Sequence, residues 1–343
     1  MTFKILMFIS LDKSIVTGAT HHFKKTYQVN ISPNMFFKSP LDIEIHFDGE
    51  DSRKVVEINN NNASSNAKSL KDQYPLYENG ESLSGLVTLR VKEGKKVDHL
   101  GVKVNLIGSV DIAKSNSEYK KSTVDTFLCL SADLCPQGEL MHSQTFQFSF
   151  KDVEKRYESY RGRNVDISYY VKVTVLRKST DIVKIKKFWC YLYKTIPTSG
   201  PSGQNEDAKP VKLDIGIENC LHIEFEFSKS QYSIKDVIVG RIYFLLTRLK
   251  VKHMELSLIT RETCGLEPNQ LSDSTSIRYE IMDGSPVKGE TIPIRLFLGG
   301  YDLVPNTSCN YFNIKNYLSL VIIDEDGRRY FKQTEIFLYR TRD

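Results

Sequence analysis

The segment Val165-Asp-Ile-Ser-Tyr-Tyr-Val-Lys-Val-Thr-Val175 decides the fold class, because every second residue is apolar and most residues between them are polar. A period of two is typical of a β-strand with one buried and one solvated face. The same alternation occurs in residues 41–47, 87–91, 102–106, 146–150, 221–227, 292–296 and 318–322. No segment of convincing length has the period of a helix. The sequence therefore predicts an all-β chain.

A linker is predicted in the middle of this series of strands. Residues 195–210 hold three prolines and two glycines and hardly any apolar side chain, so they cannot bury enough surface to fold. We expect an N-terminal domain over residues 35–192, a linker over 193–210 and a C-terminal domain over 211–340. Residues 1–34 show no clean periodicity and are expected to lie outside the fold.

The two halves also resemble each other. Four short segments occur in the same order in both: Gly85–Leu89 with Gly240–Phe244, Val97–Val102 with Val251–Leu256, Thr145–Phe150 with Thr291–Leu296, and Tyr170–Val175 with Tyr317–Ile322. Each match is weak alone, but their shared order indicates a duplication. Because a single sheet would leave its apolar face in water, we expect two tandem β-sandwich domains, each made of two packed sheets.

Composition argues against several classes of function. The 343 residues carry a formal net charge of +5. Four lysines and one aspartate place +3 of this in residues 1–34, which leaves +2 for the rest. That is too little for a nucleic-acid-binding face, and no basic cluster with interleaved aromatic residues is present. No apolar run approaches the ~20 residues that span a bilayer, so we expect membrane attachment only through partners.

The N-terminus and the cysteines favour the cytoplasm. Asp12 and Lys13 end the apolar run Ile5–Leu11 too early for a convincing signal peptide. The six cysteines form no CxxC pair. Cys190 and Cys220 lie in apolar segments and are interpreted as small core residues.

No candidate active site, cofactor site or metal site is found. A GxSxG motif and a phosphate-binding loop between a strand and a helix are both missing. His222-Ile-Glu224 matches the start of a zinc deaminase signature, but no Pro-Cys-x-x-Cys follows, which favours a solvated pair on a strand. Asp324-Glu-Asp326 precedes Gly327 and is typical of a solvated hairpin turn. The sequence therefore predicts a protein that is not an enzyme.

Apolar residues beside turns are the best candidates for binding. Asp283-Gly284 predicts a tight turn, which would bring Ile281 and Met282 to the end of a sheet. There they would form either an adaptable contact patch or part of the sandwich core, and the spacing alone does not decide between the two. Tyr330 and Phe331 also follow a turn, and for them the pattern favours the core.

Several long segments resemble the vacuolar protein sorting 26 family, the arrestin-like subunit of retromer. The resemblance covers roughly residues 36–340. Its most specific parts are Ile217–Phe227, Lys235–Leu246, Tyr279–Leu298 and Arg328–Gln333, with weaker matches at Asn79–Gly85 and Glu154–Tyr160. It implies two tandem arrestin-like β-sandwiches, no enzymatic activity and no cofactor.

The resemblance also implies partners and residues that bind them. Ile281 and Met282 correspond to the loop that docks on the large α-solenoid subunit of retromer, of the vacuolar protein sorting 35 family. That subunit in turn holds the phosphoesterase-like subunit of the vacuolar protein sorting 29 family. Ile215 and Phe331 correspond to positions that contact the cytosolic tails of cargo together with a sorting nexin. The implied location is the cytoplasmic side of the endosome membrane, as a peripheral protein that retrieves cargo to the Golgi or the plasma membrane.

Three other functions are possible from the residues. The first is an arrestin-type adaptor of another endosomal recycling complex, which the match around Ile281 and Met282 disfavours. The second is a free-standing trafficking adaptor that recruits ubiquitin ligases, for which a Pro-Pro-x-Tyr motif would be needed, and the chain has no Pro-Pro dipeptide. The third is an enzyme with an unrecognised site, which activity assays would detect.

Overall fold

The computed structural model describes residues 39–59, 71–112, 123–194, 210–264, 270–309 and 312–342. Within these ranges the regular structure is almost entirely β-strand, and the single helix is a short 3-10 turn, η1 (Glu50–Ser52). The all-β prediction is therefore confirmed. None of the helices in the described ranges is long and apolar enough to cross a bilayer. The predicted extension over residues 1–34 and most of the predicted linker lie outside the described residues.

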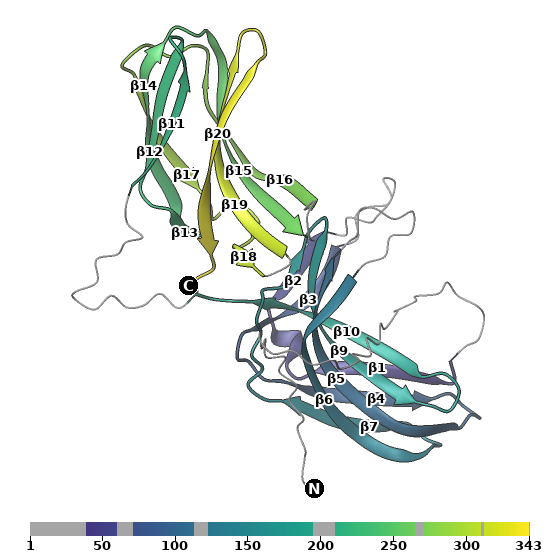
Figure 1. Cartoon of the computed structure of the whole chain (residues 1–343). Coiled ribbons are helices and arrows are strands. Elements are labelled where there is room, and N and C mark those ends of the chain that lie inside the picture. The colour runs from purple at the N-terminus through teal and green to yellow at the C-terminus, as the bar shows by residue number, and fades with distance from the viewer. Residues whose placement is uncertain are drawn as a thin grey trace, which may run out of the picture.

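The first half of the chain forms two sheets that pack face to face (Figure 1). The smaller sheet has the order β1 (Leu41–Phe47), β4 (Leu83–Val91) and β7 (Gln144–Phe150). The larger sheet has the order β2 (Val55–Asn59), β3 (Lys71–Glu78), β10 (Ile182–Tyr191), β9 (Val165–Leu176), β5 (Val97–Ile112) and β6 (Thr123–Leu140), with β8 (Tyr160–Arg161) beside β9. We call this unit the first sandwich.

The second half repeats this plan in a second sandwich. Its smaller sheet has the order β11 (Val211–Ile217), β12 (Leu221–Phe227), β14 (Val237–Thr247) and β17 (Thr291–Phe297). Its larger sheet has the order β13 (Gln231–Ser233), β20 (Arg329–Tyr339), β19 (Phe312–Asp324), β15 (Val251–Cys264) and β16 (Gln270–Asp283), with β18 (Thr307–Ser308) beside β19. This is the two-domain arrestin-like arrangement expected from the sequence.

The four matched segments occupy equivalent strands of the two sandwiches: β4 with β14, β5 with β15, β7 with β17, and β9 with β19. The equivalence extends further, because β3 pairs in parallel with β10 as β13 does with β20. Among the strands of the described residues, two have no counterpart in the other sandwich. β2 extends the larger sheet of the first sandwich, and β11 extends the smaller sheet of the second.

One pair of equivalent glycines explains part of the sequence repeat. Gly85 in β4 lies opposite Phe47, and Gly240 in β14 lies opposite Phe227. A Cβ atom at Gly85 would lie 2.1 Å from the carbonyl oxygen of His46, and one at Gly240 would lie 2.6 Å from that of Glu226. Only glycine allows the neighbouring backbone to approach this closely.

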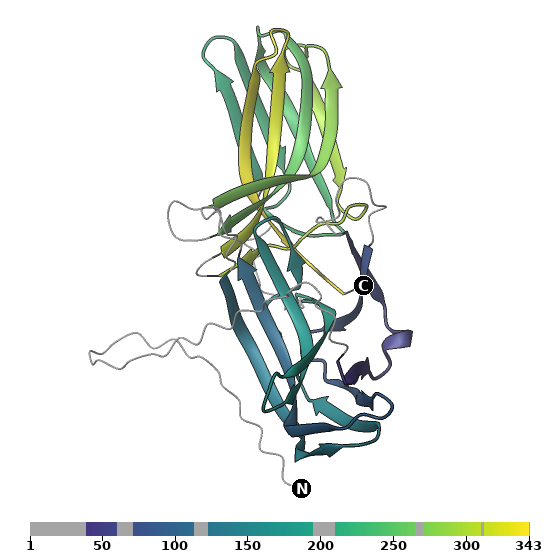
Figure 2. The same ribbon diagram turned by 90° about the vertical axis from the view of Figure 1, so that its right-hand side faces the viewer.

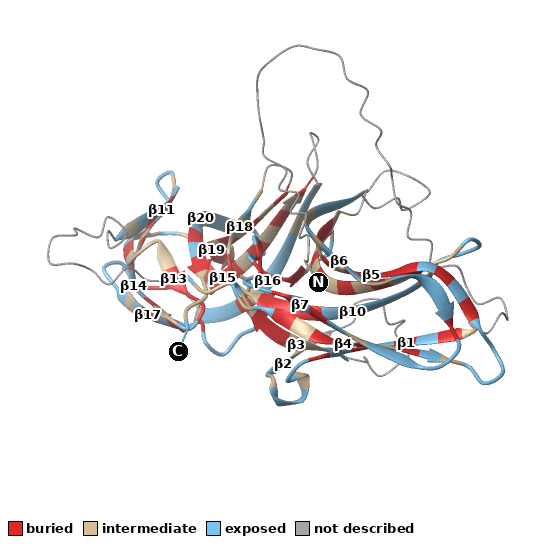
Figure 3. Cartoon of the chain, turned by 90° about the horizontal axis from the view of Figure 1, so that it is seen from below, coloured by how far each residue is buried: buried red, intermediate tan, exposed pale blue. Residues whose placement is uncertain are grey.

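The alternating apolar residues are buried in both sandwiches, so that buried and exposed residues alternate along many strands (Figure 3). The first core gathers around fully buried residues such as Val104, Tyr169 and Phe188, and the second around residues such as Phe225, Leu256 and Leu320. Cys190 is buried, as predicted, but Cys220 is exposed. The prediction for Cys220 is wrong because the residue lies in the turn between β11 and β12, not in a strand.

The two sandwiches lie end to end and share a small apolar cluster (Figure 2). Tyr157 and Ile167 of the first sandwich pack with Phe312 and Ile314 of the second. The Tyr157 hydroxyl lies 3.3 Å from the Cys309 sulfur. Burial raises the pKa of Tyr157 to about 12. This contact buries polar as well as apolar groups of both sandwiches.

A buried carboxylate from the second sandwich fixes a turn of the first. Glu262 of β15 is 4% exposed and accepts a hydrogen bond from the Tyr160 hydroxyl. It also accepts from the backbone N–H groups of Arg163 and Asn164, at 2.8 and 2.9 Å. A Cβ atom at Gly162 would lie 1.6 Å from Glu262 Oε1, so any larger residue there would displace this carboxylate from its hydrogen bonds.

A carboxylate of the first sandwich makes the reciprocal contact with a residue of the second. Arg340, just after β20, donates to Glu158 of the first sandwich, with Nη2 at 2.7 Å from Oε1. Its guanidinium carbon lies 3.7 Å from the centroid of the Tyr191 ring. Burial raises the pKa of Glu158, while the hydrogen bonds from Arg340 act against that rise. Two such contacts, one from each side, hold the relative orientation of the sandwiches.

Candidate partner-binding surfaces

Ile281 and Met282 lie at a β-bulge in the last residues of β16. Met254 of β15 pairs with Met282, whereas the next residue, Glu255, pairs with Glu280. Ile281 is therefore the extra residue that has no partner on β15. A bulge of this kind interrupts the strict in-and-out alternation of side chains, which places two consecutive apolar residues near the same sheet surface.

The chain turns immediately after this bulge. β16 ends at Asp283, and Gly284 has a φ angle of +96°, which favours glycine. The Gly284 N–H donates to the carbonyl oxygen of Lys252 at 2.7 Å. The Ser285 hydroxyl accepts from the N–H of Val251 at 2.8 Å and donates to its carbonyl at 3.0 Å. These bonds hold the turn against the start of β15.

Both candidate side chains are half-buried. Ile281 and Met282 pack against the edge of the second core, and each keeps part of its surface in solvent. The sequence left two alternatives open for these residues, a contact patch or a part of the sandwich core. The half-buried side chains combine features of both. Tyr279 before them and Val287 after them are exposed, Val287 by 71%. The end of β16 thus presents apolar surface on a backbone that is fixed by hydrogen bonds.

This end of β16 lies at the end of the second sandwich that is remote from the first. Asp283 pairs with His253 near the start of β15, whereas Cys264 at the other end of β15 belongs to the cluster between the sandwiches. Eleven residues at about 3.3 Å each separate His253 from Cys264, or roughly 36 Å. A partner bound here would not contact the first sandwich through the same surface.

Charged groups surround a buried carboxylate beside the bulge. Glu255 is 5% exposed, and its oxygens lie 3.5 Å from Arg278 Nε and 3.6 Å from an Arg329 nitrogen. His253 Nε2 lies 3.6 Å from the same carboxylate. The sequence reasoning missed Glu255. The signal was a glutamate at an outward position of β15, with Arg278 on the adjacent β16 and Arg329 on β20, two strands away, but the pairing register is needed to bring these groups together.

Ile215 and Phe331 lie on two neighbouring strands but differ sharply in exposure. Ile215 in β11 is 7% exposed and belongs to the second core. Phe331 in β20 is 64% exposed. β11 and β20 lie next to each other although they belong to different sheets. Phe331 therefore presents its side chain, whereas Ile215 can offer a partner only the backbone of its strand unless the sheet rearranges.

The core interpretation of Tyr330 and Phe331 is wrong for Phe331. Tyr330 pairs with Ile322, whose side chain lies in the core, and Tyr330 is half-buried there. Phe331 pairs with Val321 and faces outward, because successive side chains of a strand alternate. The Tyr330 hydroxyl donates to Asp324 at 3.0 Å, and this hydrogen bond raises the pKa of the phenol.

The carboxylate run before Gly327 is only partly a solvated turn. Glu325 and Asp326 are exposed, but Asp324 is 2% exposed and accepts from the N–H of Arg328 at 2.8 Å. Asp324 therefore closes the β19–β20 hairpin and holds the backbone that leads to Phe331. The His222 side chain is 49% exposed and lies 3.9 Å from Asp214, as expected for a solvated residue on a strand.

Comparison with known proteins gives one consistent result. The family profile "Vacuolar protein sorting-associated protein 26" matches residues 37–327. The chain is 57% identical over 378 positions to "Carboxypeptidase Y-deficient protein 8" of Saccharomyces cerevisiae, which covers 90% of this chain and 100% of the relative. It is 45% identical to "Vacuolar protein sorting-associated protein 26" of Schizosaccharomyces pombe, with 90% and 98% covered. It is 42% identical to the human protein "Vacuolar protein sorting-associated protein 26B", with 90% and 87% covered.

Proposed function

Because the chain belongs to the vacuolar protein sorting-associated protein 26 family and is a vacuolar sorting protein, we propose that it is a non-enzymatic scaffold and cargo-adaptor subunit of retromer. In this role it joins the large α-solenoid subunit and, through it, the phosphoesterase-like subunit. Together with a sorting nexin it captures cargo on the cytoplasmic side of endosomes. We also propose that the first domain ends at residue 192 and that the second domain begins at residue 211.

The half-buried Ile281 and Met282 at the end of β16 carry this proposal. A binding interface commonly has an apolar centre held on a rigid element and surrounded by a polar rim. The Gly284 and Ser285 hydrogen bonds supply the rigidity, and the charged groups near Glu255 supply the polar surroundings. An apolar groove between two helices of a solenoid would cover the exposed parts of both side chains.

Cargo and sorting nexin are proposed to bind along β11 and β20. β11 is the edge strand of its sheet, so its outer backbone groups are available to an extended peptide. Phe331 would contact an apolar side chain of that peptide or of the nexin. Ile215 would act through the backbone of β11, since its own side chain lies in the core.

The test of the solenoid contact is a pull-down from cell lysate with the wild-type chain and the variant Ile281→Asp/Met282→Asn. We expect the variant to lose the solenoid and phosphoesterase-like subunits while its circular dichroism spectrum stays that of a folded β protein. Equal recovery of both subunits by the two proteins would refute the assignment of this surface.

The cargo surface needs its own test. Phe331→Ser is expected to reduce the binding of a cargo tail in the presence of the sorting nexin, with normal binding to the solenoid. A variant at the equally exposed Phe297 of β17, Phe297→Ser, is the matched control, because Phe297 is 63% exposed on the other sheet. If both variants bound the cargo tail like the wild type, Phe331 would have no part in cargo binding.

A further inference from the structure

The outer edge of β17 pairs with no other strand of the described residues. β17 is the last strand of the smaller sheet of the second sandwich, next to β14 (Figure 1). The Leu298 N–H donates to the carbonyl oxygen of Asp236 at 2.9 Å, which fixes the phase of the hydrogen bonds between the two strands. In an antiparallel pair, residues that exchange hydrogen bonds alternate with residues whose N–H and C=O groups point away. The backbone groups of residues 291, 293, 295 and 297 therefore point to the free edge.

Pro293 divides this edge, because it has no N–H group to offer to another strand. On the side toward the end of β17, Arg295 and Phe297 remain, and each has both an N–H and a C=O group at the edge. No turn or loop of the described ranges forms a backbone hydrogen bond with these groups. An antiparallel strand can therefore form two hydrogen bonds at each of these two residues.

Apolar side chains border this part of the edge on the outer face of the sheet. Phe297 is 63% exposed, and Val239, diagonal to it on β14, is 47% exposed. Val237, directly opposite Phe297, is half-buried. Opposite and diagonal side chains on one face of a sheet lie within reach of each other. An incoming strand would therefore meet an exposed aromatic ring beside the backbone with which it pairs.

Two positive charges on this side of the sheet are not neutralised. Arg295 and Arg241 are exposed on the same face, and neither forms an ion pair with a described residue. On the other side of the same sheet, Lys212 lies 2.7 Å from Glu224 and 4.0 Å from Glu226. Glu226 lies opposite Arg241 in the register, but the described cation within 4.0 Å of its carboxylate is Lys212. The free edge of β17 is thus flanked by available arginines.

We propose that a partner protein adds an extended acidic segment to the free edge of β17, with an apolar side chain against Phe297 and a carboxylate at Arg295. Main-chain hydrogen bonds would supply affinity, and alternate side chains would supply specificity. Charge complementarity selects an acidic segment, and it disfavours a second copy of β17, which would bring further arginines. The surface shares no residue with Ile281, Met282, Phe331 or β11, so it does not depend on the function proposed above.

The test uses the full chain and the fluorescein-labelled peptide Ser-Leu-Thr-Glu-Thr-Glu-Ser, with binding followed by fluorescence polarisation at constant salt. In an antiparallel register the leucine lies opposite Phe297, the first glutamate opposite Arg295, and the second glutamate opposite Pro293, which is beside Arg241. We expect saturable binding of this peptide. We expect no binding of the peptide in which lysine replaces both glutamates.

Methylation of peptide nitrogens separates strand addition from simple contact with the surface. Methyl groups on the nitrogens of the leucine and the first glutamate remove donors that point to β17, and should weaken binding by at least about tenfold. Methyl groups on the two threonine nitrogens, which point away from β17, are the matched control and should change binding by less than about twofold. Equal binding of the two methylated peptides would overturn the proposal.

Variants of the chain test the side chains beside the edge. Arg241→Glu/Arg295→Glu should weaken binding by at least about tenfold, because two attractive contacts become repulsive. Phe297→Ser should weaken it by about threefold, since a cross-strand apolar contact is lost. The control Lys184→Glu/Lys187→Glu changes net charge as much as the arginine variant, at exposed positions of β10, and should change binding by less than about twofold.

Three further outcomes would overturn the proposal. Absence of saturable binding to the wild type would exclude an acidic strand at β17. Equal weakening by the lysine variant would mean that net charge alone attracts the peptide. Preference for the lysine-containing peptide would contradict selection by the two arginines. Thermal unfolding of each variant, monitored by circular dichroism, verifies that both sandwiches remain folded.

Discussion

The two sandwiches carry the same β-bulge, but in different settings. In the second sandwich Met254 pairs with Met282 and Ile281 is the extra residue. In the first, Val102 pairs with Cys135, Lys103 pairs with Asp133, and Leu134 is the extra residue. Leu134 and Cys135 are half-buried against the first core, as Ile281 and Met282 are against the second. The bulge alone therefore does not make a binding surface.

What differs is the length of strand beyond the bulge. β6 continues for five residues after Cys135, to Leu140, whereas β16 ends one residue after Met282. In β6 the later residues pair with Val97–Gly101 and extend the sheet beyond the bulge. In β16 the turn at Gly284 leaves the apolar pair at the end of the sheet. Duplication supplied the same local geometry twice, and strand length separates a structural bulge from a proposed docking site.

The largest predicted difference between the sandwiches is in their stability at alkaline pH. Tyr77 and Tyr169 are fully buried in the first sandwich, whereas Tyr232 is the one fully buried tyrosine among the described residues of the second. Burial raises the pKa of Tyr77 to about 12 and also raises that of Tyr169. Because these pKa values lie above those of the unfolded chain, the stability they contribute is complete below pH 10 and is lost as pH rises towards 12.

We therefore expect the first sandwich to unfold at lower alkaline pH than the second. Trp189 is the only tryptophan and lies in the first sandwich, so its fluorescence reports on that half, while circular dichroism reports on both. The fluorescence transition should precede the end of the circular dichroism transition. Coincident transitions would show that the contacts between the sandwiches make the chain unfold as one unit.

Substitution of the equivalent glycines, Gly85 and Gly240, should give the next largest difference in stability. Gly85→Ala should reduce the free energy of unfolding by about 3 kcal/mol and Gly240→Ala by about 2 kcal/mol, because the new Cβ meets a backbone carbonyl in each case. The contact at Gly85 is the closer, 2.1 Å against 2.6 Å. Urea denaturation of both variants measures the difference. A larger loss for Gly240→Ala would mean that the first sandwich relaxes more easily.

The contact between the sandwiches is predicted to depend on Glu262. Glu262→Ala leaves the Tyr160 hydroxyl and two backbone N–H groups without their acceptor, so we expect a loss of about 2–3 kcal/mol in the free energy of unfolding. Glu335→Ala is the control. Glu335 forms an ion pair with Lys315 at the surface of the second sandwich, and its loss should cost less than about 0.5 kcal/mol. Equal effects would contradict the importance of the buried carboxylate.

The smallest expected loss of stability is that of Phe331→Ser, and a comparison with Ile215→Ser separates the two candidate cargo residues. Ile215→Ser should lower the free energy of unfolding by about 2–4 kcal/mol, since it removes apolar volume and adds a hydroxyl in the core. Phe331→Ser should change it by less than about 0.5 kcal/mol, because the side chain is exposed. Thermal unfolding of the two variants checks this. A large loss for Phe331→Ser would indicate that this residue has a structural role.

Much of the fold could be predicted from the sequence, because buried strands impose an alternation that is local. The segment 165–175, the four repeated segments and the turn at Gly284 could all be read without knowing the pairing. Phe331 could not be placed, since two consecutive aromatic residues cannot both face inward and only the pairing of Tyr330 with Ile322 decides which one does. The bulge at Ile281 and the charges around Glu255 likewise depend on register between strands, which the sequence does not contain.

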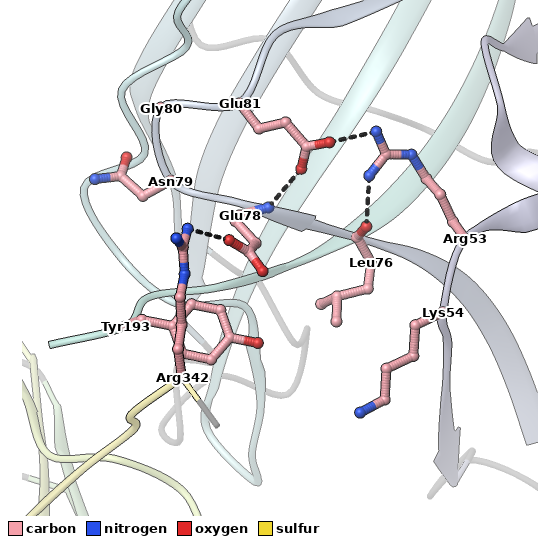
Figure 4. Close-up of a pocket in the computed structure, with 9 residues that line it drawn as sticks. All are labelled: Arg53, Lys54, Leu76, Glu78, Asn79, Gly80, Glu81, Tyr193 and Arg342. Carbon is pink, nitrogen blue, oxygen red and sulfur yellow. Dashed lines mark hydrogen bonds and ion pairs between the residues drawn. The ribbon is translucent and has the colours of Figure 1, made fainter. Parts of the chain in front are cut away.

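A pocket of about 580 Å³ between Lys54 and Arg342 could not be predicted for a related reason (Figure 4). Its walls come from β2, the β3–β4 turn and two segments that follow β10 and β20. These parts are separated by more than two hundred residues in the sequence. The contacts of Arg340 with Glu158 and of Arg342 with Glu78 and Tyr193 bring the C-terminal residues to this site.

The affinity of the purified solenoid subunit for three versions of the chain, measured by isothermal titration calorimetry, is the most direct test of the docking claim. The versions are the wild type, Ile281→Asp/Met282→Asn and Leu134→Asp/Cys135→Asn, which places the same charge at the equivalent bulge of the first sandwich. We predict that the first variant loses at least about 3 kcal/mol of binding free energy and that the second binds like the wild type. Equal affinity of all three, or equal loss in both variants, would contradict the claim that the end of β16 is the docking surface.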